Sequence, residues 1–371
     1  MKEIWLNIGI WTGRVFAVLL TFVAAVAVVL LLILNMFCDG TSPAAKQVFV
    51  TTILETGQLK FLASWFLTPE EINEIVNQNS MEAMDEEVNK SLIVVAANSN
   101  KTGSKNEKGT AFVSTGTETE KAEKSEWLEI EEIHGRSFFA TLMIVHDPSR
   151  VSLATIYPWK TYGVTLDVLV NDNDAIGGIN GGLYKSTNNS GGSPYGVVVS
   201  GGEIQYNDPE KYKGLVLIGL TEDDILDIVD IDGMKPAEIE TLVAERKIRD
   251  AVSFQEEAND KNNHFVKLVI NGEAREMNGM GSGCNPRTAI GQTADGSLLL
   301  LVTNGRGIGG NLGATASDLI NIMMEYGAVN AANLDGGSSS CMYYDGEYLM
   351  DSVTFYHANS SWRLPFAFIV K

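Results

Sequence analysis

The feature that most constrains this chain is a run of twenty residues, from Val15 to Leu34, without a charged side chain. A helix needs about 20 apolar residues to cross ~30 Å of hydrocarbon, so the run predicts a transmembrane helix. It is longer than a signal-peptide core, and no small-residue cleavage site follows it. Lys2 and Arg14 outnumber Glu3 before the run, which predicts a cytoplasmic N-terminus. We therefore expect a single-pass cell-membrane protein, anchored through residues 15–37, with an extracellular catalytic or binding domain.

Composition divides the chain into four parts. Residues 1–38 contain the cytoplasmic end and the membrane anchor. Residues 39–79 repeat apolar side chains at helical spacing and predict a helical stalk, with a dimerisation element as the alternative. Residues 80–125 are rich in polar and charged types, which predicts a flexible linker. Residues 126–371 are rich in strand patterns and form the expected globular domain.

The globular domain shows many strand patterns and few helical ones, which predicts an α+β fold around a mixed β-sheet. Thr315 precedes a helical pattern as a capping residue, and Gly327 ends that pattern. The expected helices are 236–247 and 316–326. The expected strands are two within 137–157, then 175–179, 196–199, 214–220, 265–270, 288–292, 298–303, 331–334 and 365–370.

Charge and composition exclude several classes of function. The formal net charge of -20 argues against nucleic-acid binding, which requires a basic face. Three cysteines and four histidines show no zinc-binding spacing. A disulfide between Cys284 and Cys341 and a pair of reduced thiols both remain open at this point. The sequence predicts no cofactor, and it leaves a divalent metal requirement and the oligomeric state undetermined.

The most informative motif runs from Asn330 to Ser340, where a strand of small residues leads into Asp335, two glycines and three serines. Gly336 and Gly337 lack a Cβ, so a ligand can approach the backbone closely, and the serine hydroxyls offer hydrogen bonds. The alternative is an ordinary tight turn after a buried strand.

Two further motifs suit a sugar phosphate. Asn180 ends a strand before Gly181, Gly182 and Tyr184, so an amide and an aromatic ring could orient a sugar, although a glycine hairpin is the alternative. Arg287 follows Asn285-Pro286 and opens a strand. Its planar fork matches phosphate or carboxylate, and an internal salt bridge is the competing interpretation.

Three other patterns are weaker. The run from Gly305 to Gly310 matches GxGxxG, but the next helix cap comes only at Thr315, so an NAD site is disfavoured. The acids at 172–174 suggest a calcium loop, yet Leu183 occupies the position of the bidentate glutamate. Ser338 to Ser340 lack the GxSxG context of a serine nucleophile.

Taken together, the segments INGGLY, NPRTAIGQTADGSLLLLVTNGR and GATASDLINIMMEYGAVNAANLDGGSSS resemble the phosphodiester glycosidase family, which includes bacterial exopolysaccharide-associated members. The resemblance covers about residues 127–371. It implies hydrolysis of a sugar, typically N-acetylglucosamine, that is α-linked through its anomeric carbon to a phosphodiester. The implied partner is a phosphorylated glycan or sugar-phosphate substrate on the cell surface or in an exopolysaccharide.

The resemblance also implies roles for individual residues. Arg287 would hold the phosphate, Asp335 would act at the anomeric carbon as base or nucleophile, and Asn180 would orient the sugar. The implied substrate-binding residues are Gly181, Gly182, Tyr184, Thr288, Arg306, Gly336, Gly337, Ser338 and Arg363. Because a phosphate monoester is a good leaving group, a second carboxylic acid is not required, and the retaining or inverting route stays open.

The chain departs from the family pattern at two places. Ser338 replaces the third glycine of the usual DGGGS turn, and the segment from Arg363 to Ala367 replaces a more polar run. These changes affect the expected substrate more than the expected reaction. The alternative function is a non-catalytic glycan-binding or scaffold protein in surface polysaccharide assembly.

Overall fold

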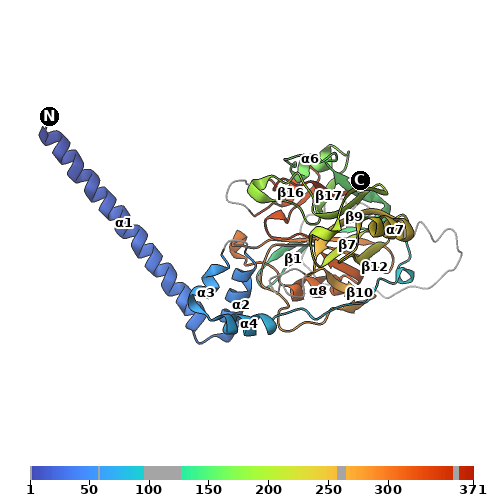
Figure 1. Cartoon of the computed structure of the whole chain (residues 1–371), viewed down its shortest axis with the longest axis horizontal. Coiled ribbons are helices and arrows are strands. Elements are labelled where there is room, and N and C mark those ends of the chain that lie inside the picture. The colour runs from blue at the N-terminus through green and yellow to red at the C-terminus, as the bar shows by residue number, and fades with distance from the viewer. Residues whose placement is uncertain (1, 57–58, 96–126, 257–264, 354–358) are drawn as a thin grey trace, which may run out of the picture. The chain divides into compact units, whose positions relative to one another are not determined.

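The computed structural model describes residues 2–56, 59–95, 127–256, 265–353 and 359–371, with side chains from Trp11 onward. The chain divides into two compact units, Met1–Val76 and Asn77–Lys371 (Figure 1). We refer to them as unit 1 and unit 2.

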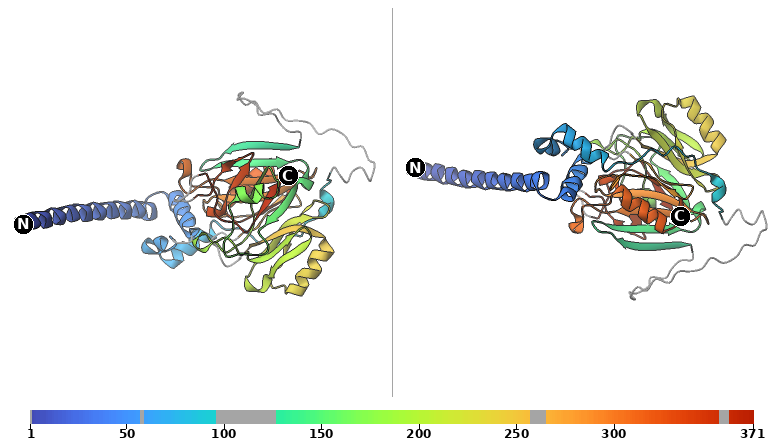
Figure 2. Two further views of the ribbon diagram at one scale, coloured as in Figure 1. Left: turned by 90° about the horizontal axis from the view of Figure 1, so that it is seen from above. Right: turned by 90° about the horizontal axis from the view of Figure 1, so that it is seen from below.

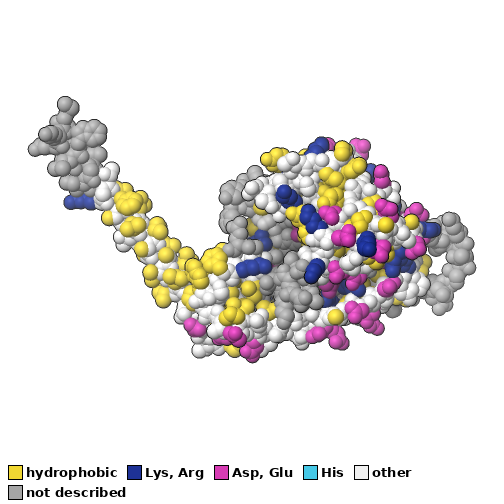
Figure 3. All heavy atoms as spheres, in the orientation of Figure 1, with side chains coloured by type: hydrophobic (Ala, Val, Ile, Leu, Met, Phe, Trp, Pro, Cys, Tyr) yellow, Lys and Arg dark blue, Asp and Glu magenta, His cyan; other side chains and the backbone are white. Residues whose placement is uncertain are grey.

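Unit 1 begins with α1 (Lys2–Asp39), which contains the predicted apolar run. Its segment Trp11–Asp39 is long and apolar enough to cross a membrane, although a signal sequence near an N-terminus passes the same test. Apolar side chains surround this helix in the space-filling view (Figure 3). The predicted helix is therefore present, and its insertion in a bilayer stays a prediction.

Three short helices follow in unit 1, as the spacing of apolar residues predicted. The Ser42 side chain accepts the Ala45 N–H at the first of them, and Thr68 and Glu71 form a reciprocal capping box at the third. Their apolar faces form a small core that includes Val50. These helices are α2 (Pro43–Leu54), α3 (Phe61–Phe66) and α4 (Pro69–Asn77).

The described residues of unit 2 form three β-sheets. The seven-stranded sheet has the order β1 (Leu128–His134), β2 (Phe139–Val145), β13 (Leu298–Thr303), β12 (Arg287–Thr293), β14 (Ala328–Asn333), β10 (Lys267–Ile270) and β11 (Glu273–Ala274). The second sheet has the order β16 (Glu347–Met350), β15 (Met342–Tyr344), β4 (Gly177–Asn180), β17 (Phe366–Val370) and β3 (Val151–Thr155). The third has the order β6 (Glu203–Asp208), β5 (Gly196–Ser200), β9 (Ile248–Gln255), β7 (Leu215–Thr221) and β8 (Leu226–Asp230).

The helices of unit 2 are α6 (Leu166–Asn171), α7 (Pro236–Arg246) and α8 (Ala316–Glu325). Figure 2 shows the third sheet with α7 as a lobe beside the other two sheets. The predicted α+β class is confirmed. All pairings between the described strands are antiparallel, whereas the prediction was a mixed sheet. A parallel pair needs a long crossover connection, usually a helix, and no described helix connects two paired strands in this way.

Successive side chains along a strand alternate between the two faces of the sheet, so one sheet contributes to two hydrophobic cores. On β13, Leu298 and Leu300 face the large central core, whereas Leu299 and Leu301 face the core beneath α8. On β7 of the third sheet, the even-numbered apolar residues face the central core and the odd-numbered ones face the core beneath α7. Successive strand residues point to opposite faces, so a strand covered on both faces becomes a continuous apolar run.

Residues 80–95 do not form the predicted linker. Met81 pairs with Met277, the Val94 N–H donates to Ala294 O at 2.9 Å, and Val88 joins the central core. Polar composition alone missed these anchors, because a segment can be fixed by main-chain bonds and a few buried side chains. Residues 96–126, the rest of the predicted linker, lie outside the described residues.

Candidate functional site

Asp335 lies where three strand ends meet. It follows β14, and its N–H donates to Gly181 O at 3.1 Å, just beyond the end of β4. The next N–H upstream, that of Leu334, donates to Thr288 O at 2.8 Å on β12. Downstream, the Gly337 N–H donates to Pro286 O at 2.8 Å. The main chain around Asp335 is therefore fixed by both the seven-stranded sheet and the second sheet.

Asn180 is the side chain that joins these elements. It is 1% exposed, and its Nδ2 donates to the main-chain oxygen of Asp335 at 2.7 Å. Its Oδ1 accepts the Thr288 hydroxyl at 2.8 Å and the Cys341 N–H at 3.1 Å. Ser340 Oγ lies 3.1 Å from Thr288 Oγ1. The structure thus brings the predicted residues Asn180, Thr288 and Asp335 together, while their catalytic roles stay predictions.

Asp335 is partly exposed as a residue, while protein surrounds its carboxyl group. Burial raises its pKa to about 7, against the opposing effects of hydrogen bonds from Ser339 and the Gly336 N–H and of the Arg306 charge. A carboxyl with such a pKa exchanges protons near neutral pH, which suits a general base or acid.

Tyr184 reaches this carboxyl through Ser339. The Tyr184 hydroxyl lies 3.0 Å from Ser339 Oγ, and burial raises the pKa of the phenol. The ring is 5% exposed, which leaves little of the aromatic face that the sequence analysis assigned to a sugar. The hydrogen-bonding role of Ser339 was not predicted, although its position four residues after Asp335 in a serine run was a signal for it.

Arg306 is the exposed cation next to Asp335. Its Nη1 donates to Ser338 Oγ at 2.8 Å, and its Nε donates to Asn285 Oδ1 at 3.0 Å. An added Cβ at Gly337 would lie 2.7 Å from Arg306 Nη2, so the guanidinium lies directly over the turn. Gly337 has φ +65, which also favours glycine. The Arg306 charge favours the ionised form of Asp335 and so lowers its pKa.

Arg287 has a different environment from Arg306. It is 3% exposed, and its guanidinium donates to Gly283 O at 3.0 Å, Ser282 Oγ at 3.1 Å and Ala314 O at 3.3 Å. Its charged group also lies 5.1 Å from the centre of the Phe265 ring. These contacts fix the loop before β12 to the segment that leads into α8. The phosphate contact predicted for Arg287 stays a prediction.

The other predicted glycines are explained by packing within the protein. An added Cβ would lie 2.8 Å from the Phe366 ring at Gly181 and 2.3 Å from Ser253 O at Gly182. At Gly336 it would lie 2.9 Å from Pro286 O. These positions need glycine even without a ligand.

Arg363 lies on an exposed loop before β17, with its guanidinium 5.3 Å from the centre of the Tyr162 ring. Its N–H donates to Asn189 Oδ1 at 2.8 Å. Among the described residues we find no direct contact between Arg363 and the turn at Asp335. The structure therefore places Arg363 on a neighbouring surface.

The competing motifs have structural explanations. The GxGxxG run forms a turn in which the Gly307 N–H donates to Asn311 O at 2.7 Å, and α8 starts only after the Thr315 cap. Cys38, Cys284 and Cys341 are all reduced and buried, which answers the disulfide question. The described part of the chain contains no group of three or more His, Cys, Asp or Glu side chains that could hold a metal ion.

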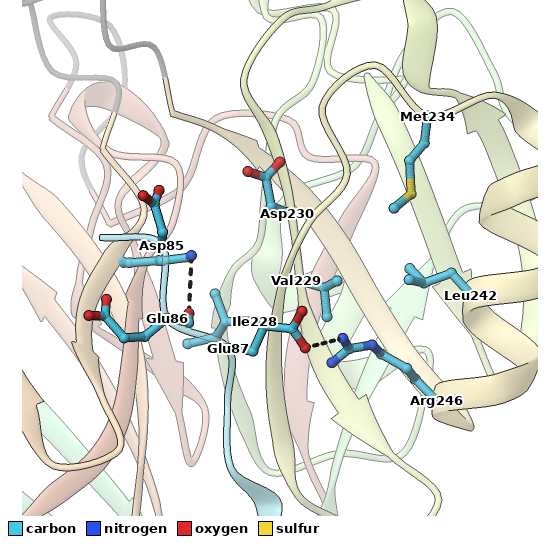
Figure 4. Close-up of a pocket in the computed structure, with 10 residues that line it drawn as sticks. Asp85, Glu86, Glu87, Ile228, Val229, Asp230, Met234, Leu242 and Arg246 are labelled. Atoms are coloured by element: carbon cyan, nitrogen blue, oxygen red, sulfur yellow. Dashed lines mark hydrogen bonds and ion pairs between the residues drawn. The ribbon is translucent and has the colours of Figure 1, made fainter. Parts of the chain in front are cut away.

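A cavity of about 230 Å³ lies elsewhere in unit 2, between residues 85–87 and the β8–α7 part of the third sheet (Figure 4). Its two cations are engaged with the protein: Lys267 Nζ donates to Glu86 O at 3.2 Å, and Arg246 pairs with Glu87 at 2.8 Å. The residues lining this cavity do not include those around Asp335. We therefore take the Asp335 turn, and not this cavity, as the candidate active site.

Three known proteins are similar to parts of this chain. A 65-residue stretch, 18% of this chain, is 40% identical to the SPbeta prophage-derived uncharacterized protein YomE of Bacillus subtilis (strain 168), and the match spans 10% of that protein. The zebrafish N-acetylglucosamine-1-phosphodiester alpha-N-acetylglucosaminidase catalytic domain aligns with a TM-score of 0.48 and 19% identity, covering 67% of this chain and 85% of that chain. A putative exported protein from Burkholderia pseudomallei K96243 aligns with a TM-score of 0.40 and 15% identity, covering 63% of this chain and 74% of that chain.

The family model described as Phosphodiester glycosidase matches residues 173–371. This range is more than half of the chain and contains Asn180, Arg287, Arg306 and Asp335. The chain therefore belongs to the phosphodiester glycosidase family.

Proposed function

We propose that this protein hydrolyses an N-acetylglucosamine α-1-phosphodiester on a cell-surface or exopolysaccharide glycan, giving free sugar and a phosphomonoester. The observation that carries the proposal is the pairing of Asp335, whose pKa is raised to about 7, with the exposed Arg306 beside it. A proton acceptor and a phosphate-binding cation side by side, on the turns after β14 and β13, are what cleavage of this bond requires.

Asp335 acts as the general base. A water oxygen forms a bond to the anomeric carbon, the bond from that carbon to the phosphate oxygen breaks, and the electron pair leaves with the phosphate. Asp335 accepts the water proton, which the solvent then carries away. The raised pKa suits this role, because it makes the carboxylate a stronger base near neutral pH.

Arg306 stabilises the charge on the departing phosphate. We assign it this contact ahead of Arg287, because Arg306 is exposed whereas Arg287 is buried against Ser282 and Gly283. Ser338, which accepts a hydrogen bond from Arg306, is the nearest side chain on the turn to contribute a second contact. A preorganised cation at a developing anion typically contributes about 10²–10³ in kcat.

Asn180, Thr288 and Arg287 act as positioning residues. The first two fix the Asp335 main chain, and Arg287 fixes the loop that carries Asn285, which in turn accepts from Arg306 Nε. In this assignment the buried residues hold the two reacting side chains at a constant separation, which is what orientation contributes to catalysis.

We also propose that α1 anchors the protein in the cell membrane, with the N-terminus in the cytoplasm and unit 2 outside. The apolar segment Trp11–Asp39 supports the anchor. Lys2 and Arg14 support the orientation. Attachment of a cysteine-reactive, membrane-impermeant label to a Ser186→Cys variant in intact cells tests it, because the exposed residue 186 reacts only if unit 2 is outside.

The test of the reaction uses the full chain in detergent with the methyl phosphodiester of N-acetylglucosamine 1-phosphate. We expect equal amounts of N-acetylglucosamine and methyl phosphate, and loss of at least about 10²-fold in kcat for Asp335→Asn. Binding of the diester without release of sugar by the unmodified protein would overturn the proposed function. Release that Asp335→Asn leaves unchanged would overturn only the role of Asp335.

A further inference from the structure

Three loops of unit 2 carry Lys160, Lys185 and Arg363 and contain no acidic residue, in a chain with 47 acidic and 27 basic side chains. The loops span residues 156–166, 181–195 and 359–365. The three cations are exposed, and among the described residues we find no ion pair for any of them. Within the loops all charges are positive, and the Asp351 carboxylate, which accepts the Asn359 N–H at 3.2 Å, lies at the edge of the third loop. The loops are therefore locally basic in a chain whose formal net charge is -20.

The three loops form one continuous surface, which we call the basic loop surface. The joining hydrogen bonds are Gly163 N–H to Ser190 O (2.7 Å), Leu364 N–H to Val164 O (2.7 Å) and Arg363 N–H to Asn189 Oδ1 (2.8 Å). Main-chain bonds of this kind keep the cations on adjacent, fixed segments. Their charges therefore act on one ligand together.

Exposed aromatic rings lie on the same loops. Tyr157 is 51% exposed and Tyr162 is 59% exposed. Tyr162 also supports the Arg363 guanidinium. Trp159 packs edge-on against Tyr157 with ring centres 5.6 Å apart, and its Nε1 donates to Gln205 O at 2.9 Å. Fixed aromatic faces suit the C–H side of sugar rings, and cations suit phosphate or carboxylate groups.

Two of the three loops are joined through the main chain to residues of the candidate active site. The loop that carries Lys185 starts at Gly181, whose oxygen accepts the Asp335 N–H. The loop that carries Arg363 leads into β17, where Ala367 pairs with Asn180. A chain-like ligand bound at Asp335 can therefore extend onto this surface.

We propose that the basic loop surface is a subsite for an anionic glycan chain, namely the part of the substrate that continues beyond the bond cleaved at Asp335. The inference rests on the proposed function, since it assigns the substrate class to that same site. Lys160 and Lys185 bind the negative groups of successive repeats, and Tyr157 and Tyr162 pack against the intervening sugars. The preferred substrate is thus a polyanionic polymer and not an isolated sugar 1-phosphodiester.

The test compares two substrates of the full chain in detergent: a four-repeat oligomer of α-1-phosphate-linked N-acetylglucosamine, and the methyl phosphodiester. In the variant Lys160→Ala/Lys185→Ala we expect KM for the oligomer to rise about tenfold, as the loss of two exposed charge contacts predicts. Values for the methyl diester stay within about twofold. Tyr162→Ala gives the same pattern, and Lys213→Ala, which removes an exposed lysine outside the surface, changes neither substrate.

A second measurement separates this inference from the proposed function. Equilibrium binding of the oligomer to the Asp335→Asn chain should weaken about tenfold when Lys160 and Lys185 are replaced, and neutral chitotetraose should not compete. Suppose that the methyl diester is cleaved and that the double variant has the same KM as the unmodified protein for both substrates. The subsite is then wrong, and the proposed function stands. If neither substrate is cleaved, the function is wrong, and binding that is independent of the two lysines would overturn the subsite as well.

Discussion

The side-chain nitrogen of Asn180 donates a hydrogen bond to the main-chain oxygen of Asp335 at 2.7 Å. This bond connects the last residue of β4, in the second sheet, to the turn after β14, in the seven-stranded sheet. The Asn180 Oδ1 is engaged at the same time by Thr288 and by the Cys341 N–H. One buried amide therefore sets the position of the proposed base relative to both sheets.

Replacement of Asn180 by alanine tests this positioning role. The change leaves the Cys341 N–H and the Asp335 oxygen without the Asn180 partner, and the Thr288 hydroxyl keeps only Ser340, so we expect the free energy of unfolding to fall by about 3 kcal/mol. Catalysis should fall as well, because Asp335 is no longer fixed. Urea unfolding and kcat measure the two effects.

Asn330→Ala is the matched control for this variant. Asn330 is also a fully buried asparagine on β14, and its Oδ1 accepts the Asn271 N–H at 2.9 Å away from the site. It should lower stability while leaving kcat within about twofold. A loss of kcat equal to that of Asn180→Ala would show that general destabilisation, and not positioning, accounts for both variants.

Alanine variants of Arg306 and Arg287 should differ in what they lose: the first mainly activity, the second mainly stability. Arg306→Ala removes an exposed cation beside Asp335, so we expect kcat/KM to fall by about 10²–10³ with little change in the unfolding free energy. Arg287→Ala removes a buried guanidinium that three acceptors share, so we expect a loss of about 2–4 kcal/mol in stability. Measurements of kcat at saturating substrate and of kcat/KM at limiting substrate, together with thermal unfolding, distinguish the two variants. A folded, fully active Arg306→Ala protein would contradict the assignment of the phosphate to Arg306.

The sequence predicted the strands around the site well, because their residues are apolar on both faces and are bounded by turn residues. The predicted range of β13 matches the observed Leu298–Thr303, and the cap at Thr315 starts α8 as expected. By contrast, β9 was not predicted, since Arg249 and Asp250 interrupt its apolar pattern. The structure pairs these two charges with each other at 2.7 Å and also pairs Arg249 with the distant Asp224, a tertiary contact that periodicity does not reveal.

The candidate site was predictable as a set of residue types but not as a division of roles. Asn180, Arg287 and Asp335 stood out because they are polar residues at the ends of predicted strands, close to glycines. Burial could not be read from that pattern, and burial is what separates Arg287 from Arg306. The same limit applies to Tyr184, whose ring is enclosed by protein.

The pH dependence of activity follows from the environment of Asp335. A general base acts when ionised, so kcat should rise with pH and level off above about 7, the pKa to which burial raises this carboxyl. Ser339 donates to the carboxylate and lowers its pKa, so Ser339→Ala should move the midpoint to higher pH. A rate that falls as pH rises through 7 would instead identify Asp335 as a proton donor.

Stability should vary with pH in the opposite direction. The pKa of Asp335 is raised from the model-peptide value of 3.8 to about 7, so folding favours the neutral carboxyl. This contribution to stability is fully present below pH 3.8 and is lost as pH rises through about 7. Asp335→Asn removes this pH-dependent contribution to stability, because the amide does not ionise. The difference in unfolding free energy between the two proteins should therefore change between pH 4 and 7 and be constant above 8.

The segment 80–95 is held to the third sheet by a buried ion pair, and this contact can be tested separately from the active site. Asp227 is 1% exposed, and Lys90 Nζ lies 2.6 Å from its Oδ2, while Arg246 lies 3.4 Å from its Oδ1. Lys90→Met leaves the buried carboxylate with one weaker partner, so we expect a loss of about 3 kcal/mol. Hydrogen exchange at the Val94 N–H, which donates to Ala294 O, should accelerate. The double variant Lys90→Met/Asp227→Asn should recover part of the loss, because no charge is then left buried without its partner, and an equal or larger loss would contradict the ion-pair explanation.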